Sequence, residues 1–180
     1  MKKGILLFLI ILLPIAADAF TGIVEINGIW YQVNTDRQEA EVFPRQDGKQ
    51  YEGEIVIPTI VEYNGTSCHV TKIQDHAFAT ASHLTSITIP NSINSISVGA
   101  FYGCTGLTTV NLAEGISIIE EHAFSYCTSL SSINLPSSIT TIGEYAFYHS
   151  ILLTSELLQT KSWLFFLLHS KLSPIFAINF

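Results

Sequence analysis

The repeated unit of this chain reads IQDHAFATASHLTSITIPNSINS at residues 73–95 and IEEHAFSYCTSLSSINLPSSITT at residues 119–141. An Ala-Phe pair, a Leu and several β-branched residues return at one constant step, without insertion or deletion. The apolar columns are Ala77/Ala100/Ala123/Ala146, Phe78/Phe101/Phe124/Phe147, Leu84/Leu107/Leu130/Leu153, Ile73/Ile96/Ile119/Ile142, Ile87/Val110/Ile133, Ile89/Leu112/Leu135 and Ile93/Ile116/Ile139. Such a period indicates a solenoid, in which each coil buries its apolar side against its neighbours.

The step from Phe78 to Phe101 is the repeat period, and it has the length expected of a leucine-rich repeat. Repeats of that class have a period of about 20 to 29 residues and are built on L-x-x-I-x-I/L. The sequence therefore predicts a short, right-handed α/β repeat solenoid, with coils that begin near Ile55, Ile73, Ile96 and Ile119 and a partial coil at Ile142. Phe78, Ala81 and Leu84 are spaced by threes, which suits a short helical or 3₁₀ turn on the return side of each coil.

Each coil contains a segment that alternates polar and apolar residues, as in Thr85–Ile89. This alternation predicts a strand that points Ile87 and Ile89 into the core and its polar residues to solvent. Stacked coils would form a parallel sheet with an exposed Ser/Thr/Asn face. Its candidate ligand contacts are Ser86, Thr88, Thr109, Asn111, Ser132 and Asn134.

The first coil departs from the period. Ile55 and Ile57 match Ile87 and Ile89 at a longer step than the repeat period, so extra residues precede Ile73. Those residues include Tyr63-Asn64-Gly65-Thr66, and Asn-Gly between β-prone residues is a strong hairpin signal. We expect a projecting hairpin there, with Asn64 as a further candidate contact residue.

The N-terminal residues 1–19 have the three parts of a secretory signal peptide. Lys2 and Lys3 precede an apolar run from Ile5 to Ala17, and Ala17-Asp18-Ala19 forms an A-x-A cleavage site. The run is shorter than the about 20 residues of a spanning helix, which makes a retained anchor the weaker alternative. A secreted or cell-surface location follows from this prediction.

Non-periodic segments flank the predicted solenoid, which spans residues 55–153. Residues 20–54 contain short β-prone pieces at 29–33 and 40–43 and are predicted to form a β-rich cap over the first coil. Residues 154–180 lose the repeat and are strongly apolar. They are expected either to form a helix that covers the last coil or to have no selected fold, and any membrane contact is expected only through this tail.

The three cysteines do not indicate a disulfide framework or a zinc site, because their number is odd and no C-x-x-C pair is present. Cys104 and Cys127 share a column with Ala81 and Ser150. Small buried thiols are the expected role, since free cysteine behaves as a small hydrophobe. A disulfide between adjacent coils is the alternative.

No motif in the chain requires an enzyme, a cofactor or a metal. Asp75-His76 and Glu121-His122 pair a carboxylate with an imidazole, but the two histidines lie two coils apart, about 10 Å at the spacing of strands, too far to share one metal ion. The formal net charge of -7 and the absence of Lys and Arg between Lys72 and Lys161 argue against a nucleic-acid partner.

The pattern I-x-x-x-A-F-x-x-C-x-x-L-x-x-I-x-L-P-x-S-I at Ile119–Ile139 resembles the BspA-like leucine-rich repeats of bacterial surface and secreted proteins. The segment Gly53–Pro58, followed by Tyr63-Asn64-Gly65, is similar to the first coil of that family, so the resemblance spans roughly positions 22–153. It implies a non-catalytic module for adhesion or protein binding, in some members to host matrix proteins.

Two functional hypotheses follow. The first is a secreted protein-binding or adhesion module that contacts a protein ligand or a host surface protein through the polar sheet face and the Asn64 hairpin. The rival is a structural remnant, a truncated copy of a longer adhesin without its own ligand.

Overall fold

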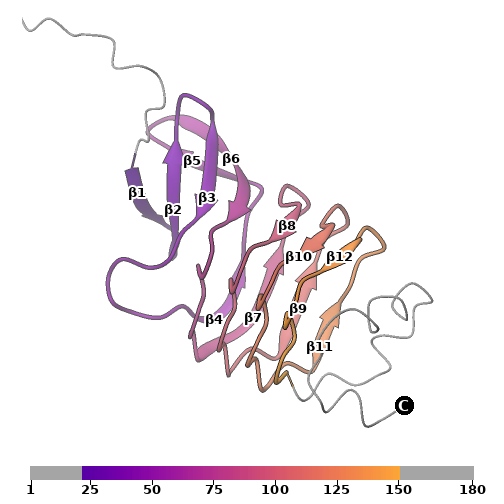
Figure 1. Cartoon of the computed structure of the whole chain (residues 1–180). Coiled ribbons are helices and arrows are strands. Elements are labelled where there is room, and N and C mark those ends of the chain that lie inside the picture. Colours follow the sequence, from indigo (N-terminus) through magenta and orange to yellow (C-terminus); the bar gives the residue numbers. More distant parts are fainter. Residues whose placement is uncertain (1–21, 151–180) are drawn as a thin grey trace, which may run out of the picture.

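The computed structural model of this protein describes residues 22–150, which form β-strands and turns arranged in three sheets (Figure 1). No residue in this range is helical. The predicted signal peptide and the predicted tail at 154–180 lie outside the described residues. No helix in the described part is long and apolar enough to cross a membrane.

The N-terminal unit is a five-stranded sheet with the strand order β1-β2-β3-β6-β5. Its strands are β1 (Gly22–Ile26), β2 (Ile29–Asn34), β3 (Glu39–Val42), β5 (Ile60–Tyr63) and β6 (Thr66–Ile73). Alternate residues of β2 and β3 face the core: Ile29, Tyr31, Val33, Ala40 and Val42 are buried. The β-prone pieces predicted at 29–33 and 40–43 are therefore confirmed as strands.

The predicted hairpin at Asn64-Gly65 is confirmed. Strands β5 and β6 pair antiparallel up to Tyr63 and Thr66, and the two turn residues have φ angles of 50° and 78°. Asn and Gly tolerate this left-handed conformation, which a two-residue hairpin turn requires. The hairpin is not an isolated projection from the solenoid. Strand β6 also pairs in parallel with β3, so the hairpin is part of the cap sheet.

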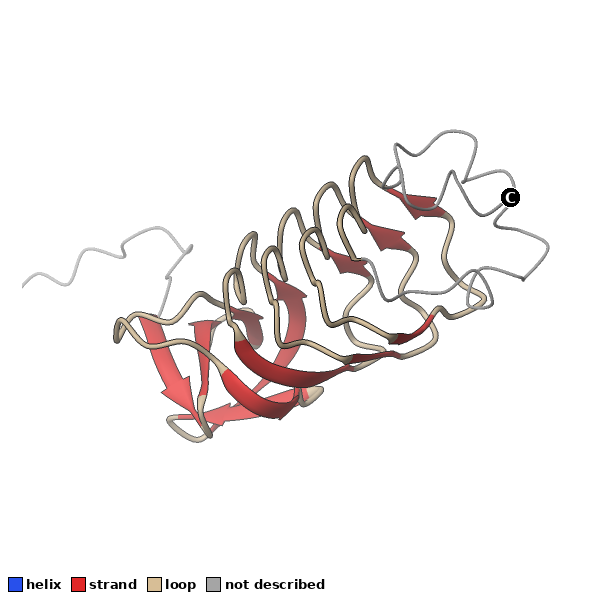
Figure 2. Cartoon of the chain, turned by 90° about the horizontal axis from the view of Figure 1, so that it is seen from below, coloured by secondary structure: helices blue, strands red, loops and turns tan. Residues whose placement is uncertain are grey.

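Two parallel sheets form the sides of the solenoid, and Figure 2 shows its coils stacked side by side. The four-stranded sheet has the order β11-β9-β7-β4, and the three-stranded sheet has the order β12-β10-β8. Their strands are β4 (Glu52–Val56), β7 (His83–Ile89), β8 (Ser95–Ile96), β9 (Thr109–Leu112), β10 (Ile118–Ile119), β11 (Ser132–Asn134) and β12 (Thr141–Ile142). Ile87, Val110 and Ile133 are partners across neighbouring strands, as the repeat period predicts.

The prediction of a helical or 3₁₀ turn on the return side of each coil is wrong. In a helix every amide bonds to a carbonyl of the same segment. Here the amides alternate: Ala77 N donates to Gln74 O in its own coil at 3.1 Å, whereas Phe78 N donates to Ala100 O of the next coil at 2.8 Å. Alternate amides thus tie neighbouring coils together, and the α/β class is wrong for the described residues.

The core is built from the predicted apolar columns. The rings of Phe78, Phe101, Phe124 and Phe147 stack nearly parallel, with centroid separations of 5.0, 5.1 and 5.4 Å. Within residues 22–150, the Ala, Leu and Ile columns around them are buried, apart from the half-buried Leu135 and Ile142 in the last coils. The predicted core is therefore confirmed where a coil has neighbours on both sides.

Candidate ligand-binding surface

The polar residues predicted to face solvent lie together on the four-stranded sheet. Ser86, Thr109 and Ser132 are partners across β7, β9 and β11. Thr88, Asn111 and Asn134 form the second row in the same register. The residues between the rows, Ile87, Val110 and Ile133, are buried, so alternation along each strand creates this polar face.

Strand β4 extends the polar face by one strand toward the cap. Glu54 pairs with Ser86 and Val56 pairs with Thr88, which places both side chains at the ends of the two polar rows. Val56 is 67% exposed, the largest exposure of a large apolar side chain among the described residues. The sequence predicts this extension, because Ile55 repeats the position of Ile87 in the coil pattern.

Asn134 has a structural role within the face. Its Oδ1 accepts a hydrogen bond from Leu112 N at 2.6 Å, and its Nδ2 donates to Leu112 O at 2.8 Å. The side chain thereby satisfies both main-chain groups of Leu112, where β9 ends. Its amide is therefore already hydrogen-bonded within the sheet, although the residue is exposed.

Asn64 does not join the polar face. It is exposed at the tip of the β5–β6 hairpin, at the cap end of the molecule and away from β9 and β11 (Figure 1). The structure therefore separates the seven predicted contact residues into a six-residue face and one hairpin tip.

The column that holds the cysteines is a row of buried hydrogen-bond donors. The thiol of Cys104 donates to Phe78 O at 3.0 Å, and the thiol of Cys127 donates to Phe101 O at 3.1 Å. Ser150 makes the equivalent bond to Phe124 O at 2.7 Å. All three cysteines are free and buried, so the predicted thiol role is confirmed and the alternative inter-coil disulfide is wrong.

Burial of these thiols predicts a loss of stability in alkali. Burial raises the pKa of Cys104 from 9.0 to about 12 and raises that of Cys127 as well. The folded protein thus holds these protons at a pH where the unfolded chain releases them, and its stability falls as pH rises from about 9 through about 12. We expect the urea midpoint to drop over this interval. A double Cys104→Ser and Cys127→Ser variant should show a shallower drop, and an unchanged slope would contradict this cause.

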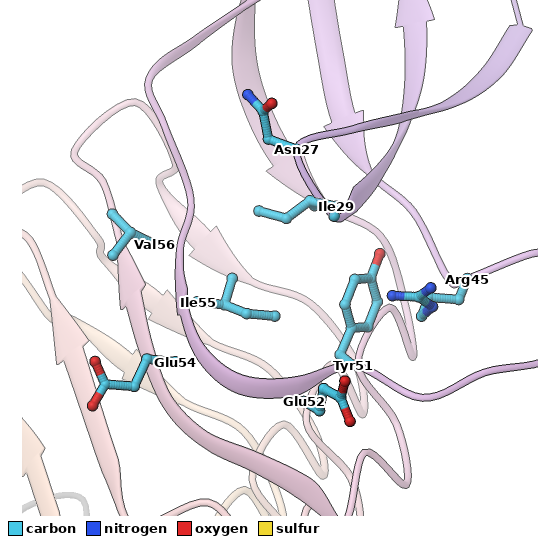
Figure 3. A pocket seen from close by; sticks show the side chains of 9 residues that line it. Asn27, Ile29, Arg45, Tyr51, Glu52, Glu54, Ile55 and Val56 are labelled. Atoms are coloured by element: carbon cyan, nitrogen blue, oxygen red, sulfur yellow. The ribbon is translucent and has the colours of Figure 1, made fainter.

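A pocket of about 310 Å³ lies where the cap meets the first coil (Figure 3). It is lined by Asn27, Gly28, Ile29, Arg45, Tyr51, Glu52, Glu54, Ile55 and Val56. The Tyr51 hydroxyl accepts from Trp30 N and donates to Phe43 O, both at 2.9 Å. Arg45 lies 5.3 Å from the Tyr51 ring centroid and pairs with Asp47, whose pKa it lowers.

Tyr51 holds the cap against the solenoid. Its ring centroid is 4.5 Å from that of Phe78, so it begins the aromatic column of the core. Burial raises the pKa of Tyr51 to about 12, which keeps the hydroxyl a neutral donor and acceptor between the two cap segments. Because its polar atoms are used within the protein, this junction has a structural role.

His76 and His122 lie in the same column two coils apart, with Gly99 between them. Gly99 has a φ of 56°, and a Cβ there would come within 2.4 Å of the His76 ring. The glycine therefore provides both the backbone conformation and the room that His76 needs. Within the described residues, no group of three or more His, Cys, Asp or Glu side chains is placed to hold a metal ion.

A family profile described as the BspA type leucine rich repeat region, with six copies, matches residues 60–164. This match covers more than half of the chain. The chain belongs to the BspA-type leucine-rich repeat family. The match begins at the hairpin and continues past Leu153, where the constant spacing of the repeat stops.

Solved structures of bacterial leucine-rich repeat proteins have a similar fold. A leucine-rich repeat protein from Bacteroides capillosus is 27% identical with a TM-score of 0.57, over 68% of this chain and 98% of its own. The T. pallidum leucine-rich repeat protein is 27% identical with a TM-score of 0.61, over 73% of this chain and 58% of its own. The pneumococcal vaccine antigen PcpA is 27% identical with a TM-score of 0.57, over 74% of this chain and 37% of its own. Among curated proteins, none matches significantly.

The BspA-type coils also carry a surface feature that the sequence reasoning missed. The turns of the return side place six aromatic and imidazole rings next to one another on the outside of three successive coils. These residues, here named the aromatic strip, are Tyr102, His122, Tyr126, Tyr145, Tyr148 and His149. They occupy three different columns of the repeat, so a search for a single recurring residue does not find them.

Proposed function

We propose that this protein is a secreted or cell-surface, non-catalytic module that binds a protein ligand through the polar face of its four-stranded sheet. The observation that carries the proposal is the in-register arrangement of Ser86, Thr88, Thr109 and Asn111 on β7 and β9. Short polar side chains on a rigid sheet offer many hydrogen bonds at a small cost in side-chain entropy. Leucine-rich repeat families are generally non-catalytic, which agrees with this assignment.

The predicted signal peptide supports a role outside the cell. The basic, apolar and A-x-A parts of residues 1–19 form the pattern of a signal peptide. We further propose that the ligand is a host or matrix surface protein. This more specific proposal rests on the family resemblance together with the predicted signal peptide. The proposed right-handed winding of the coils belongs to the same family expectation.

The remnant hypothesis is the second candidate, and the size of the face favours it. Four strands span only about 15 Å across the sheet at the usual strand spacing. A face of this width is small against the about 800 Å² that each partner buries in a standard interface. The chain also spans only 58% and 37% of the lengths of two of its structural relatives. On this hypothesis the chain keeps the fold of a longer adhesin but has no ligand of its own.

Binding to a panel of immobilised extracellular-matrix proteins, measured by surface plasmon resonance, tests the proposal. Replacing Thr88 and Asn111 together by Tyr covers the centre of the polar face without changing charge, and Tyr is favoured in strands. We expect this double variant to bind at least about tenfold more weakly, because bulky rings exclude a complementary surface.

The hairpin supplies the matched control. Asn64→Gly keeps the positive φ of the turn and removes the side-chain amide, and we expect it to bind as wild type does. Loss of binding in Asn64→Gly alone would move the contact to the hairpin. No binding of this chain, alongside robust binding by a longer relative, would favour the remnant.

A further inference from the structure

The aromatic strip is continuous along the stacked coils. The Tyr102 and Tyr126 ring centroids are 5.4 Å apart, and those of Tyr126 and Tyr148 are 5.5 Å apart. His122 stacks on Tyr145 at 5.1 Å, and His149 stacks on Tyr126 at 5.1 Å. Tyr102 and Tyr126 are 37% and 38% exposed, so two rings of the strip remain open to solvent.

Four of the six residues of the strip have an unusual backbone conformation. His122, Tyr126, Tyr145 and His149 have φ angles of 55° to 60°, a conformation that residues other than Gly rarely adopt. The positions equivalent to His122 and Tyr126 in the preceding coil are glycines. Large rings therefore occupy positions for which glycine is the less strained residue, and core packing does not require them, because they lie outside the buried Phe column.

The border of the strip carries carboxylates. Glu121 is exposed, with its Oε1 at 3.5 Å from His122 Nε2, and Glu144 occupies the same column in the next coil. Glu120 is the neighbour of Glu121 in the sequence. No Lys or Arg occurs between Lys72 and the end of the described range, so the formal charge of this part of the solenoid is negative.

We propose that the aromatic strip is a second binding surface, separate from the polar sheet face, and that it takes a Lys- or Arg-rich segment of a partner protein. Ammonium and guanidinium groups are attracted to the faces of tyrosine rings. The flanking carboxylates attract the same groups over a longer range, so rings and border select one sign of charge. An acidic or phosphorylated segment would be repelled by the same border.

Fluorescence anisotropy of a labelled peptide of alternating lysine and glycine tests the proposal with the purified protein. The test variant combines Tyr102→Ala and Tyr126→Gly, which installs the residues that stand at the same columns in the preceding coil, Ala79 and Gly103. We expect its dissociation constant to rise at least about tenfold, because both open rings are lost. A Glu121→Gln and Glu144→Gln variant should bind more weakly and show a smaller dependence on salt.

Three controls separate this surface from others. The tyrosine variant has the same charge as wild type, so unchanged binding would mean that net charge alone attracts the peptide and would overturn the proposal. Equal binding of a peptide with glutamine in place of lysine would overturn it as well. The Thr88→Tyr and Asn111→Tyr variant should bind the lysine peptide as wild type does. A failure of the sheet-face proposal can therefore be distinguished from a failure of the aromatic-strip proposal.

Hydrogen exchange of the wild-type protein provides a measurement that does not depend on any variant. Added lysine peptide should slow exchange in the turns at residues 99–103 and 122–126. Protection confined to β7 and β9 would place the peptide on the sheet face and contradict the assignment to the strip.

Discussion

Replacing Phe101 by Ala is expected to lower the free energy of unfolding by about 3 to 5 kcal/mol. The Phe101 side chain is fully buried, with the rings of Phe78 and Phe124 at 5.0 and 5.1 Å on either side. Its removal opens a cavity that neighbouring coils cannot fill, because their amides fix the spacing between coils. Chemical denaturation followed by circular dichroism measures the change.

The adjacent residue is the control for this cavity. Tyr102 is exposed, and its column holds Ala in the preceding coil, so Tyr102→Ala should change stability by less than about 1 kcal/mol. If Phe101→Ala were as stable as Tyr102→Ala, the stacked aromatic core would be refuted.

Replacing Tyr51 by Ala is expected to have a similar cost, about 3 to 5 kcal/mol, through loss of packing against Phe78. It also leaves Trp30 N and Phe43 O without the hydroxyl that they share. Since the same ring belongs to the core column and to the cap, we expect the cap and the solenoid to unfold at different denaturant concentrations in this variant. Fluorescence of Trp30, which lies in the cap strand β2, and circular dichroism would then give separate transitions.

A conservative change separates the two roles of Tyr51. Tyr51→Phe keeps the ring contact and removes only the hydroxyl, and it should cost about 1 to 3 kcal/mol with a single transition. A Tyr51→Ala protein that still unfolds in one transition, with wild-type stability, would show that this residue does not couple the cap to the coils.

The periodic part of the sequence predicted the core because burial alone sets its pattern. Phe101 and Ile87 recur at the step of one coil, and any residue that faces a neighbouring coil must be apolar. The polar face followed from the same reasoning, since residues alternate across a strand. At Asn134 this reasoning identified the right strand but missed the bonds to Leu112.

The features that were missed depend on contacts between residues far apart in sequence. The aromatic column of the core begins at Tyr51, but its sequence separation from Phe78 matches neither the repeat period nor the longer separation of Ile55 from Ile87. No repeated spacing therefore identifies Tyr51 as a member of the column. The parallel pairing of β6 with β3 is equally non-local. On the return side, spacing by threes fits both a helical turn and a series of β-turns, and the choice depends on whether an amide finds its acceptor in its own coil or in the next.

Crosslinking of engineered cysteines tests the register of the coils most directly. Ser86 and Thr109 are partners on adjacent strands, about 5 Å apart, whereas Ser86 and Ser132 are two strands apart, about 10 Å. A disulfide forms only when the two Cα atoms lie within about 7 Å. We predict that Ser86→Cys with Thr109→Cys oxidises rapidly within one chain and that Ser86→Cys with Ser132→Cys does not. Ready oxidation of the second pair, or failure of the first, would contradict the stacking of one coil on the next at the repeat period.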